Sequence, residues 1–264
     1  MDNNIDIWIF GASIVGGAIG FSALGVWLAR RFSKDGRLKR HHEVAGYMLS
    51  IVGTLYSVLL GLVVVDTQSK YQEAREMTQR EADSALDLFH LAYTAPKEVR
   101  TKLHGQLRSY MRTVIDDEWP SILRTGAFNE NAKRPFRDIW WTLTQYEPQT
   151  GREQNAYQNL LDEMDDFADG RRYRLIVSQQ GLPSVMWGVL IAGGALTVLF
   201  TYLFEVEDAR AQVFMTALVT LALSLNLLLV ALFNNPYKGY MRITSRPFFY
   251  DLKVMQELEM EYHD

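Results

Sequence analysis

The sequence predicts an all-α membrane protein, with four transmembrane helices in two hairpins and a soluble antiparallel helical bundle inserted between them. Three observations support this: long uncharged apolar runs, short connectors that join them in pairs, and a polar middle segment with helical periodicity. The runs contain no Asp, Glu, Lys, Arg or His and cover residues 7–29, 44–65, 182–204 and 211–237. Each exceeds the roughly 20 residues that cross a bilayer core, and each is apolar on all sides.

These runs divide the chain into four parts. Residues 1–65 are predicted as the first transmembrane hairpin, with a connector at 30–43, and residues 182–237 as the second. Residues 66–181 form the soluble helical domain between them. Residues 238–264 form a C-terminal tail with a short amphipathic helix, which either packs on the bundle, the preferred interpretation, or lies on the membrane surface.

The soluble domain is expected to be helical throughout. Its first helix continues from the second span without Gly or Pro until Pro96, which makes about 50 residues and a length of about 75 Å. A second helix is expected from Pro96 to Glu118, ended by Trp119 and Pro120. Two more are expected at 131–146 and 151–180. Together they predict an antiparallel bundle.

The first connector is strongly basic. Its basic residues, set against Asp35 and Glu43, are Arg30, Arg31, Lys34, Arg37, Lys39 and Arg40. Short basic connectors stay in the cytoplasm, so both termini and the soluble domain are predicted to be extracytoplasmic. The opposite orientation stays open, because basic residues also occur near the other membrane face.

Composition excludes several classes of function. The chain has no cysteine, which rules out thiolate chemistry and Cys-based metal sites, and its net charge of -4 argues against a nucleic-acid partner. Its five histidines are scattered, and the acidic run at 162–169 is interpreted as a solvated helix face. No catalytic motif is present. We therefore expect no enzyme activity, no cofactor and no metal site.

The polar residues inside the spans are neutral. Proton-coupled pumps and ion-coupled transporters usually place ionisable groups at membrane depth, and here there are none. On the second span, Ser50, Thr54 and Ser57 recur near helical spacing and are candidates to line a pore, with Leu60 and Val64 as a hydrophobic constriction. The alternative is that such hydroxyls only hold helices together.

The first span carries small residues on one face, at Ala12, Gly16 and Gly20. Close backbone approach promotes helix association in lipid. The preferred interpretation is packing against the second span, and the alternative is a subunit interface.

Short elements along nearly the whole chain point to one family. They lie at the start of the second span (41–46), in the soluble domain and around the last span; the single positions are Tyr71, Arg75, Glu81, Glu118, Trp119, Pro120, Arg171, Arg172, Arg174, Asn235, Pro236, Tyr237 and Gly239. In this combination the chain resembles bacterial bestrophin-like integral membrane proteins of unknown function.

The resemblance implies a more distant similarity to bestrophins, which are pentameric anion channels with four membrane helices per subunit. The turn at 235–239 is similar to the Asn-Pro-Phe-Gly element of bestrophins. However, Tyr240, Met241 and Arg242 follow it instead of the acidic calcium clasp of animal bestrophins. Calcium gating is therefore not expected here. Bestrophins also keep both termini in the cytoplasm, opposite to the orientation predicted from charge.

We therefore expect an oligomeric, channel-like protein of the bacterial inner membrane, a pentamer by resemblance, that conducts small ions, with anions slightly favoured. Its expected partners are the lipid bilayer and further copies of itself. The alternative is a non-conducting scaffold or envelope sensor whose soluble domain binds a partner protein. In that case Trp119, Trp140 and Trp141 would form the contact surface, although bundle core is the preferred interpretation of these tryptophans.

Overall fold

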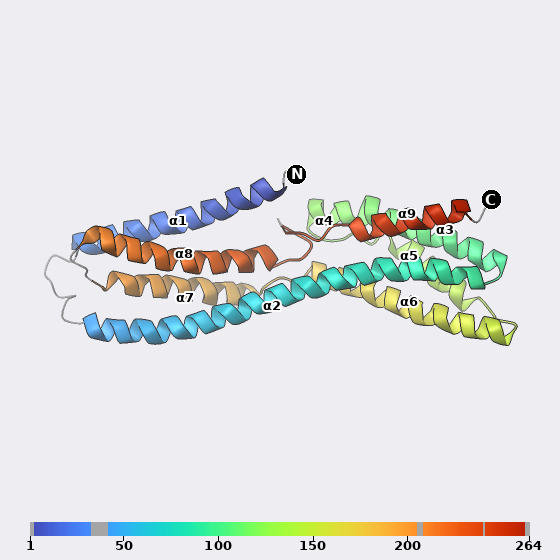
Figure 1. Cartoon of the computed structure of the whole chain (residues 1–264), viewed down its shortest axis with the longest axis horizontal. Helices are drawn as coiled ribbons and strands as arrows, with labels where there is room; N and C mark the ends of the chain where they lie inside the picture. The colour runs from blue at the N-terminus through green and yellow to red at the C-terminus, as the bar shows by residue number, and fades with distance from the viewer. Residues whose placement is uncertain (1–2, 33–41, 205–207, 240, 262–264) are drawn as a thin grey trace. The chain divides into compact units, whose positions relative to one another are not determined.

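The computed structural model describes residues 3–32, 42–204, 208–239 and 241–261, and within them every regular element is a helix (Figure 1). The chain forms two compact units. The membrane unit comprises the chain up to Lys70 together with Leu182–Asn234. The helical unit comprises Tyr71–Gly181 together with the chain from Asn235 onwards. An all-α membrane protein is thus confirmed.

Among the described residues, the membrane unit contains four helices long and apolar enough to cross a membrane. They are α1 (Asn3–Phe32), the first part of α2 (His42–Leu91), α7 (Ser184–Tyr202) and α8 (Ala209–Phe233). Helix α1 packs mainly along α8 and also touches α7. The 50 residues of α2 form one unbroken helix, and its continuation beyond the span agrees with the absence of Gly and Pro between Asp66 and Pro96.

Tyr56 attaches α2 to α7. Its ring lies against Gly193, where a Cβ atom would overlap it, and its hydroxyl donates to the carbonyl oxygen of Leu190 at 2.7 Å. Around it, Leu60 and Val230 complete a buried apolar cluster. A hydrogen bond to a backbone carbonyl allows this phenol to be buried among apolar helices at little cost.

The face of α1 predicted to pack on the second span does not do so. A Cβ atom at Gly16 or Gly20 would meet nothing within 4 Å, and Ala12 is exposed. The glycines of α1 that do permit close packing are Gly11, against Leu228 of α8, and Gly25, against Tyr202 of α7. The preferred interpretation is therefore wrong, because α1 turns a different face to its neighbours than the Gly16 pattern indicates.

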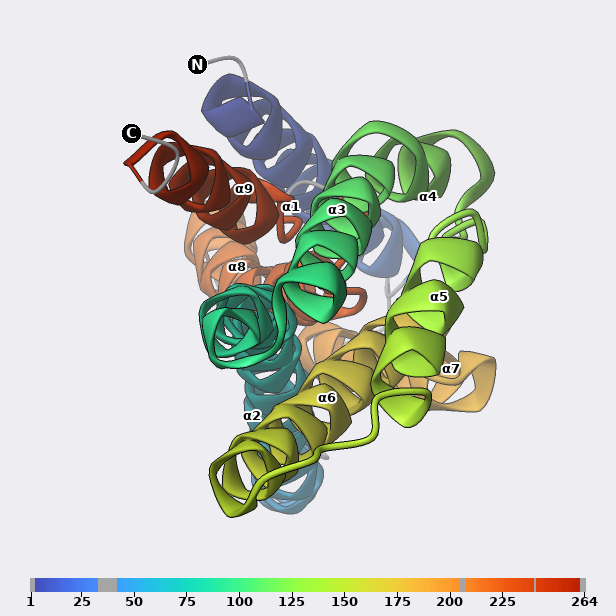
Figure 2. The same cartoon turned by 90° about the vertical axis from the view of Figure 1, so that its right-hand side faces the viewer.

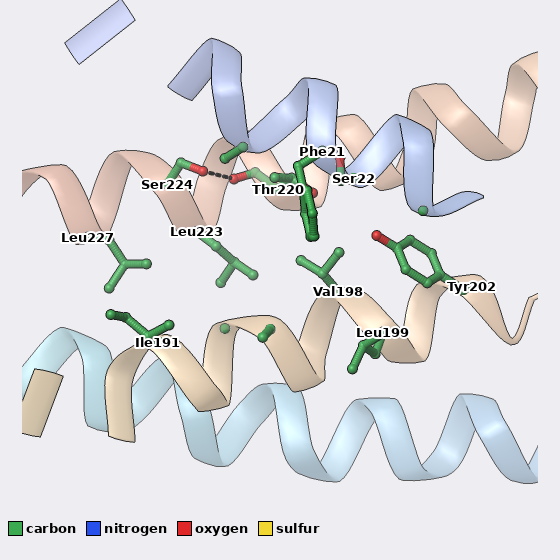
Figure 3. A pocket seen from close by; sticks show the side chains of 14 residues that line it. Phe21, Ser22, Ile191, Val198, Leu199, Tyr202, Thr220, Leu223, Ser224 and Leu227 are labelled. Atoms are coloured by element: carbon green, nitrogen blue, oxygen red, sulfur yellow. Dashed lines mark hydrogen bonds between the residues drawn. The ribbon is translucent and has the colours of Figure 1, made fainter. Parts of the chain in front are cut away.

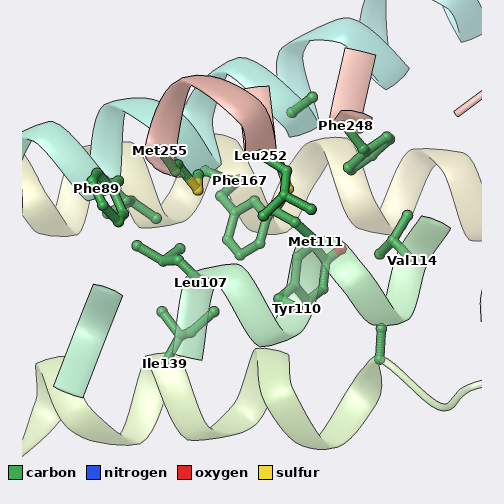
Figure 4. Close-up of a cluster of buried hydrophobic side chains, with 14 of the residues drawn as sticks. Phe89, Leu107, Tyr110, Met111, Val114, Ile139, Phe167, Phe248, Leu252 and Met255 are labelled. Atoms are coloured by element: carbon green, nitrogen blue, oxygen red, sulfur yellow. The ribbon is translucent and has the colours of Figure 1, made fainter. Parts of the chain in front are cut away.

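The helical unit is a bundle with one shared core. Figure 2 shows α9 beside α3, and α5 beside α6. After the remainder of α2, its helices are η2 (Ala92–Thr94), α3 (Lys97–Thr113), η3 (Val114–Glu118), α4 (Trp119–Thr125), α5 (Lys133–Thr144), α6 (Gly151–Ser178) and α9 (Arg246–Glu261). Phe89, Leu107, Tyr110, Ile139 and Phe167 bring side chains from α2, α3, α5 and α6 into the core (Figure 4).

Trp119 and Pro120 do not end the second helix of the bundle, contrary to the sequence prediction. The chain passes through the π-helical turn η3 and continues as α4, which ends at Gly126 with φ +75°. Proline is tolerated in the first turn of a helix, and a π-turn lets the chain adjust where Pro120 cannot donate a backbone hydrogen bond. Helix α4 ends because Gly126 adopts a left-handed backbone conformation.

The tail after α8 folds onto the helical unit. The Asn235 amide donates to the carbonyl oxygens of Ser178 and Gln180 at 3.2 and 3.1 Å, and its Oδ1 accepts from two backbone N–H groups in the turn that follows. The apolar face of α9, with Phe248, Leu252 and Met255, is buried in the core. The amphipathic helix therefore packs on the bundle and not on a lipid surface.

Gly170 lets α6 lie close to α2. A Cβ atom there would lie 2.9 Å from Cβ of Glu81 and 3.0 Å from its backbone nitrogen. Gly105 on α3 is the opposite case, since its Cβ would meet nothing within 4 Å. These two glycines form a matched pair, both inside helices.

We expect Gly170→Ala to lower the free energy of unfolding by about 1–3 kcal/mol, because the added methyl forces two backbones apart. Gly105→Ala should raise it by about 0.5–1 kcal/mol, because alanine loses less entropy on helix formation. Thermal unfolding of the detergent-solubilised protein, followed by circular dichroism, gives the order of stability. Equal melting temperatures for the two variants would contradict the close approach.

Candidate functional site

The polar line predicted on the second span is exposed in the membrane unit. Ser50, Thr54 and Ser57 are all exposed, and their spacing of four and three residues puts them along one side of α2. Ser57 Oγ donates to the carbonyl oxygen of Gly53 at 2.7 Å, which leaves its lone pairs outward. Within the described part of the chain, no other helix covers this line.

The two predicted constriction residues lie elsewhere on α2. Leu60 is 3% exposed and belongs to the cluster around Tyr56, and Val64 is half-buried against the same cluster. Both side chains serve packing inside the protomer. A path along the exposed side of α2 would therefore run past the three hydroxyl residues.

An apolar stripe runs beside this polar line on α2. Its exposed members are Tyr47, Ile51, Leu55, Val58 and Leu62. Exposed apolar helix surface in a membrane is covered either by lipid or by another protein helix. Helix α2 thus presents a narrow hydroxyl line bordered by a surface suited to lipid or to a second copy.

Several of the family-motif positions meet in a buried ion-pair network in the helical unit. On α6, Arg171 and Arg174 are three residues apart and therefore share one face. Arg174 is 0% exposed and binds both carboxylate oxygens of Glu81 on α2, from Nε at 2.6 Å and from Nη2 at 2.8 Å. The same Nη2 also donates to Glu118 at 3.0 Å.

Glu118, at the end of η3, is the second acceptor of this network. Arg171 donates to its two carboxylate oxygens at 2.9 and 3.2 Å, and the backbone N–H of Ala132 donates at 3.1 Å. Tyr110 completes the network: its hydroxyl donates to Glu81 and accepts from Arg171 at 2.9 Å. Two guanidinium groups and two carboxylates make the cluster neutral. Bidentate pairs of this kind are the strongest hydrogen-bonded ion pairs in proteins.

The surroundings of the network keep its charges in place. Burial acts to lower the pKa of Arg174, but the carboxylates of Glu81 and Glu118 outweigh it and hold that pKa well above its ordinary value. Burial, reinforced by Glu81, raises the pKa of the Tyr110 hydroxyl, so it stays a proton donor. The rings of Phe128 and Trp119 lie 4.7 and 5.3 Å from the Arg174 guanidinium carbon.

The remaining motif positions are mostly structural. Trp119 is buried and donates to the carbonyl oxygen of Ile243 at 3.4 Å, and the carbonyl oxygen of Pro236 accepts from Ile243 at 2.8 Å. Gly239 has φ +87°, a conformation that favours glycine. Tyr71 is half-buried and packs against the core. Arg75 is exposed, and Arg172 pairs with Asp169 at 3.0 Å.

Sequence reasoning did not find the partners within the network. Arg174 stood among the motif positions, but nothing in the sequence paired it with Glu81, 93 residues away. Tyr110 lies three residues after Leu107, so its spacing alone indicates one more apolar position of a helix. The two arginines at three-residue spacing are no signal by themselves, because arginine lies mostly on solvated surfaces.

The tryptophans divide between core and surface. Trp119 is bundle core as predicted, with its ring 5.5 Å from that of Phe248. Trp140 and Trp141, on α5, are 37% and 61% exposed, so the prediction of core is wrong for both. The apolar stripe of α5 that faces the bundle runs through Ile139 and Leu143 instead.

Metal-ligating side chains do not gather within the described residues: no three of His, Asp or Glu are placed to hold an ion. The acidic run on α6 is spread over the helix surface. Asp166 pairs with Arg80 of α2 at 3.4 Å, and Asp169 pairs with Arg172.

One carboxylate of the helical unit lies in an unfavourable place. Asp251 on α9 is 9% exposed, and its Oδ2 has no hydrogen-bond partner in the described part of the chain. Burial, together with Asp83 and Asp87 of α2, raises its pKa to about 6. Folding therefore favours the protonated form of this side chain.

A family model decides the affiliation of the chain. The model of the bestrophin-like domain matches residues 16–248, which is most of the sequence. The chain belongs to the bestrophin-like family. No curated protein matches this bestrophin-like chain.

Solved structures share the fold of the bestrophin-like chain. A single-residue variant of a bacterial bestrophin homologue from Klebsiella pneumoniae has a TM-score of 0.70 at 12% identity, over 93% of this chain and 97% of that one. A second structure of a bestrophin homologue from that organism has a TM-score of 0.62 at 13% identity, over 90% and 94%. A variant described as a membrane protein has 0.68 at 12%, over 92% and 97%. At this identity the likeness establishes the fold alone.

For the bestrophin-like chain we expect Arg174→Met to lower the free energy of unfolding by about 3–5 kcal/mol, because two buried carboxylates lose a partner. The melting temperature should fall by roughly 10 °C. Arg172→Met is the matched control, two residues away on the same helix, and should change stability by less than about 0.5 kcal/mol because its ion pair is exposed. Similar melting temperatures for both variants would rule out the network as a source of stability.

Asp251 gives a pH-dependent prediction. Its pKa in the folded state, about 6, lies above the ordinary value near 3.9, so its destabilising effect is greatest above pH 6 and fades as pH falls toward about 4. We expect Asp251→Asn to raise stability at pH 7.5 by at most about 3 kcal/mol, with the gain shrinking toward pH 4. Asp165→Asn, on an exposed residue, is the control. Melting curves across this pH range that show no gain at neutral pH would contradict the assignment.

Proposed function

We propose that this chain is a subunit of an oligomeric channel that passes small ions, with α2 lining the path. The observation that carries the proposal is the exposed hydroxyl line of Ser50, Thr54 and Ser57 on a helix whose other sides pack in the protomer or are apolar. Neutral hydroxyls can replace part of an ion's hydration shell without trapping it. Membership of the bestrophin-like family supports this function over enzyme activity.

The surfaces that one protomer leaves uncovered support oligomerisation. The stripe of Tyr47, Ile51, Leu55 and Val58 borders the hydroxyl line, and the small-residue face of α1 at Gly16 and Gly20 is open. If α2 lines a central path, neighbouring copies must meet along such faces. We take the number of copies as five, by the resemblance to bestrophins.

The remaining parts of the proposal rest on charge and on the family. Small anions are slightly favoured as the conducted ions by the resemblance to bestrophins, which conduct anions. We place the protein in the bacterial inner membrane with the 30–43 connector in the cytoplasm and the helical unit outside, by the positive-inside rule. Most of that connector, residues 33–41, lies outside the described residues.

Ion flux into liposomes tests the proposed function directly. The purified protein would be reconstituted and exposed to halide gradients and, separately, to potassium gradients, with matched empty vesicles. Flux above that of empty vesicles supports a channel and gives its selectivity. Absence of ion flux through correctly assembled oligomers under both gradients would refute conduction.

Thr54→Phe should reduce the flux by at least about tenfold, because the added ring fills the path at the middle of the hydroxyl line. Thr54→Ser is the matched control: it keeps a hydroxyl at the same position and adds no bulk, so the flux should stay near that of the unmodified protein. Both variants would be compared at equal reconstituted amounts and equal oligomer size. A Thr54→Phe protein that conducts normally would remove α2 from the path.

A non-conducting scaffold or envelope sensor is the second candidate. The exposed tryptophans of α5, Trp140 and Trp141, favour it, because tryptophan is enriched where proteins bind one another. If this alternative holds, the protein captures a stable protein partner from the envelope, and Trp141→Ala abolishes this capture. No ion flux is then measured.

A further inference from the structure

A crevice opens between α1, α7 and α8 in the membrane unit (Figure 3). Its volume is about 640 Å³. Small side chains create the space, because Ala18 and Ser22 on α1 face Gly194 and Ala195 on α7 across it. Phe21, which is 77% exposed, is part of the wall, so the crevice communicates with the outer surface of the helices. In a bilayer, that surface is in contact with lipid.

The wall of the crevice does not require a polar ligand, because its serine and threonine hydroxyls are hydrogen-bonded within their own helices. The hydroxyls of Ser22, Thr220 and Ser224 each donate to a carbonyl oxygen of their own helix, at 2.9, 2.8 and 2.6 Å. Everything else along the wall is apolar apart from the Tyr202 hydroxyl at one end. An empty apolar crevice of this size loses dispersion contacts on every side, so hydrocarbon is the occupant that stabilises it.

The depth of the crevice matches one leaflet of a bilayer. Ile191 and Tyr202 mark its ends on α7, and eleven residues of helix at 1.5 Å each make about 16 Å, close to half of a hydrocarbon core about 30 Å thick. Tyr202 is the last residue of α7, and Trp27, which is 54% exposed, lies near the end of α1. Tyr and Trp are typical of the membrane interface. The crevice thus runs from headgroup level to the middle of the membrane.

Positive charge lies at the interfacial end. Gly25 of α1 contacts the Tyr202 ring, and α1 continues from there to Arg30 and Arg31 in its last turn. The Arg31 guanidinium carbon lies 5.4 Å from the centre of the Trp27 ring. Arg210 lies in the first turn of α8, which Asp208 caps. Guanidinium groups at headgroup level attract phosphate.

We propose that this crevice binds one acyl chain of a phospholipid from the leaflet on the side of the α1 and α7 C-termini, with the phosphate held beside Arg31. The lipid is a structural ligand that joins α1 to α7. The exposed hydroxyls of α2 take no part in it, so this binding and ion conduction can be tested separately.

Retained lipid tests the proposal. The full-length protein would be washed extensively in detergent, and phospholipid per protomer counted by native mass spectrometry. The unmodified protein should retain one phospholipid, and Ala195→Phe, which fills the crevice, should retain none. Ala192→Phe is the matched control, since it introduces the same ring three residues earlier on α7 at an exposed alanine outside the crevice. It should retain the lipid.

Two further results would overturn the proposal. One is an unmodified protein that carries no phospholipid, and the other is equal retention by the two phenylalanine variants. If Ala195→Phe elutes as misfolded protein, Ala18→Phe fills the same space from α1 and replaces it. A changed oligomer size on filling the crevice, with no lipid in the unmodified protein, would identify a neighbouring copy as the occupant instead.

Lipid-exchange experiments distinguish binding of the acyl chain from binding of the lipid headgroup. Phosphatidylglycerol and phosphatidylcholine with identical chains would be offered to lipid-stripped protein, and we expect the first to bind more tightly. Arg31→Gln should remove this preference while one lipid still binds. Loss of all binding in Arg31→Gln, or no preference in the unmodified protein, would contradict the placement of the phosphate.

Discussion

The helical unit depends on one buried interaction, the bidentate pairing of Arg174 with Glu81. A guanidinium group that is 0% exposed is tolerated only because two carboxylates and several aromatic rings replace its water shell. That requirement fixes the surrounding geometry. Gly170 must leave room for Glu81, η3 must deliver Glu118, and Tyr110 must point its hydroxyl into the cluster. Helices from distant parts of the sequence are thereby held in one arrangement.

The two units are stabilised by different physics. The helical unit buries apolar side chains away from water, with Phe89, Leu107 and Phe167 fully buried in its core. In the membrane unit, lipid is as apolar as the side chains, so packing depends on close contacts such as Tyr56 against Gly193 and Gly25 against Tyr202. Helix α2 contains both kinds of surface, and its sequence changes accordingly from uniformly apolar to amphipathic after Asp66.

The spans and the long α2 helix could be predicted from the sequence because they follow from local composition. Uncharged runs of more than about 20 residues specify the spans, and the absence of Gly and Pro from Asp66 to Ala95 specifies the continuation of α2. The end at Trp119 and Pro120 was predicted wrongly, since a π-turn can accommodate a proline that an ideal helix cannot. The face of α1 that packs was also wrong, because small residues permit close approach on any side and only the partner helix decides between Gly16 and Gly25.

The candidate site, too, could be predicted from the sequence only in part. Ser50, Thr54 and Ser57 could be selected by spacing alone, and their exposure in the protomer keeps the predicted pore line in place as a hypothesis. Leu60 shows the limit of that reasoning, because its burial against Val230 depends on a helix 170 residues away in the sequence. Periodicity gives the direction of a side chain around its own helix but not what stands opposite it.

The neutral cluster of Arg171, Arg174, Glu81 and Glu118 also constrains how the sequence can diverge. Replacing any one member by a neutral residue leaves an uncompensated charge in a buried site, and its partner lies on another helix. A substitution at one of these positions is therefore least costly when its partner changes as well. We expect the four positions to change together if they change at all, although they lie far apart in the sequence.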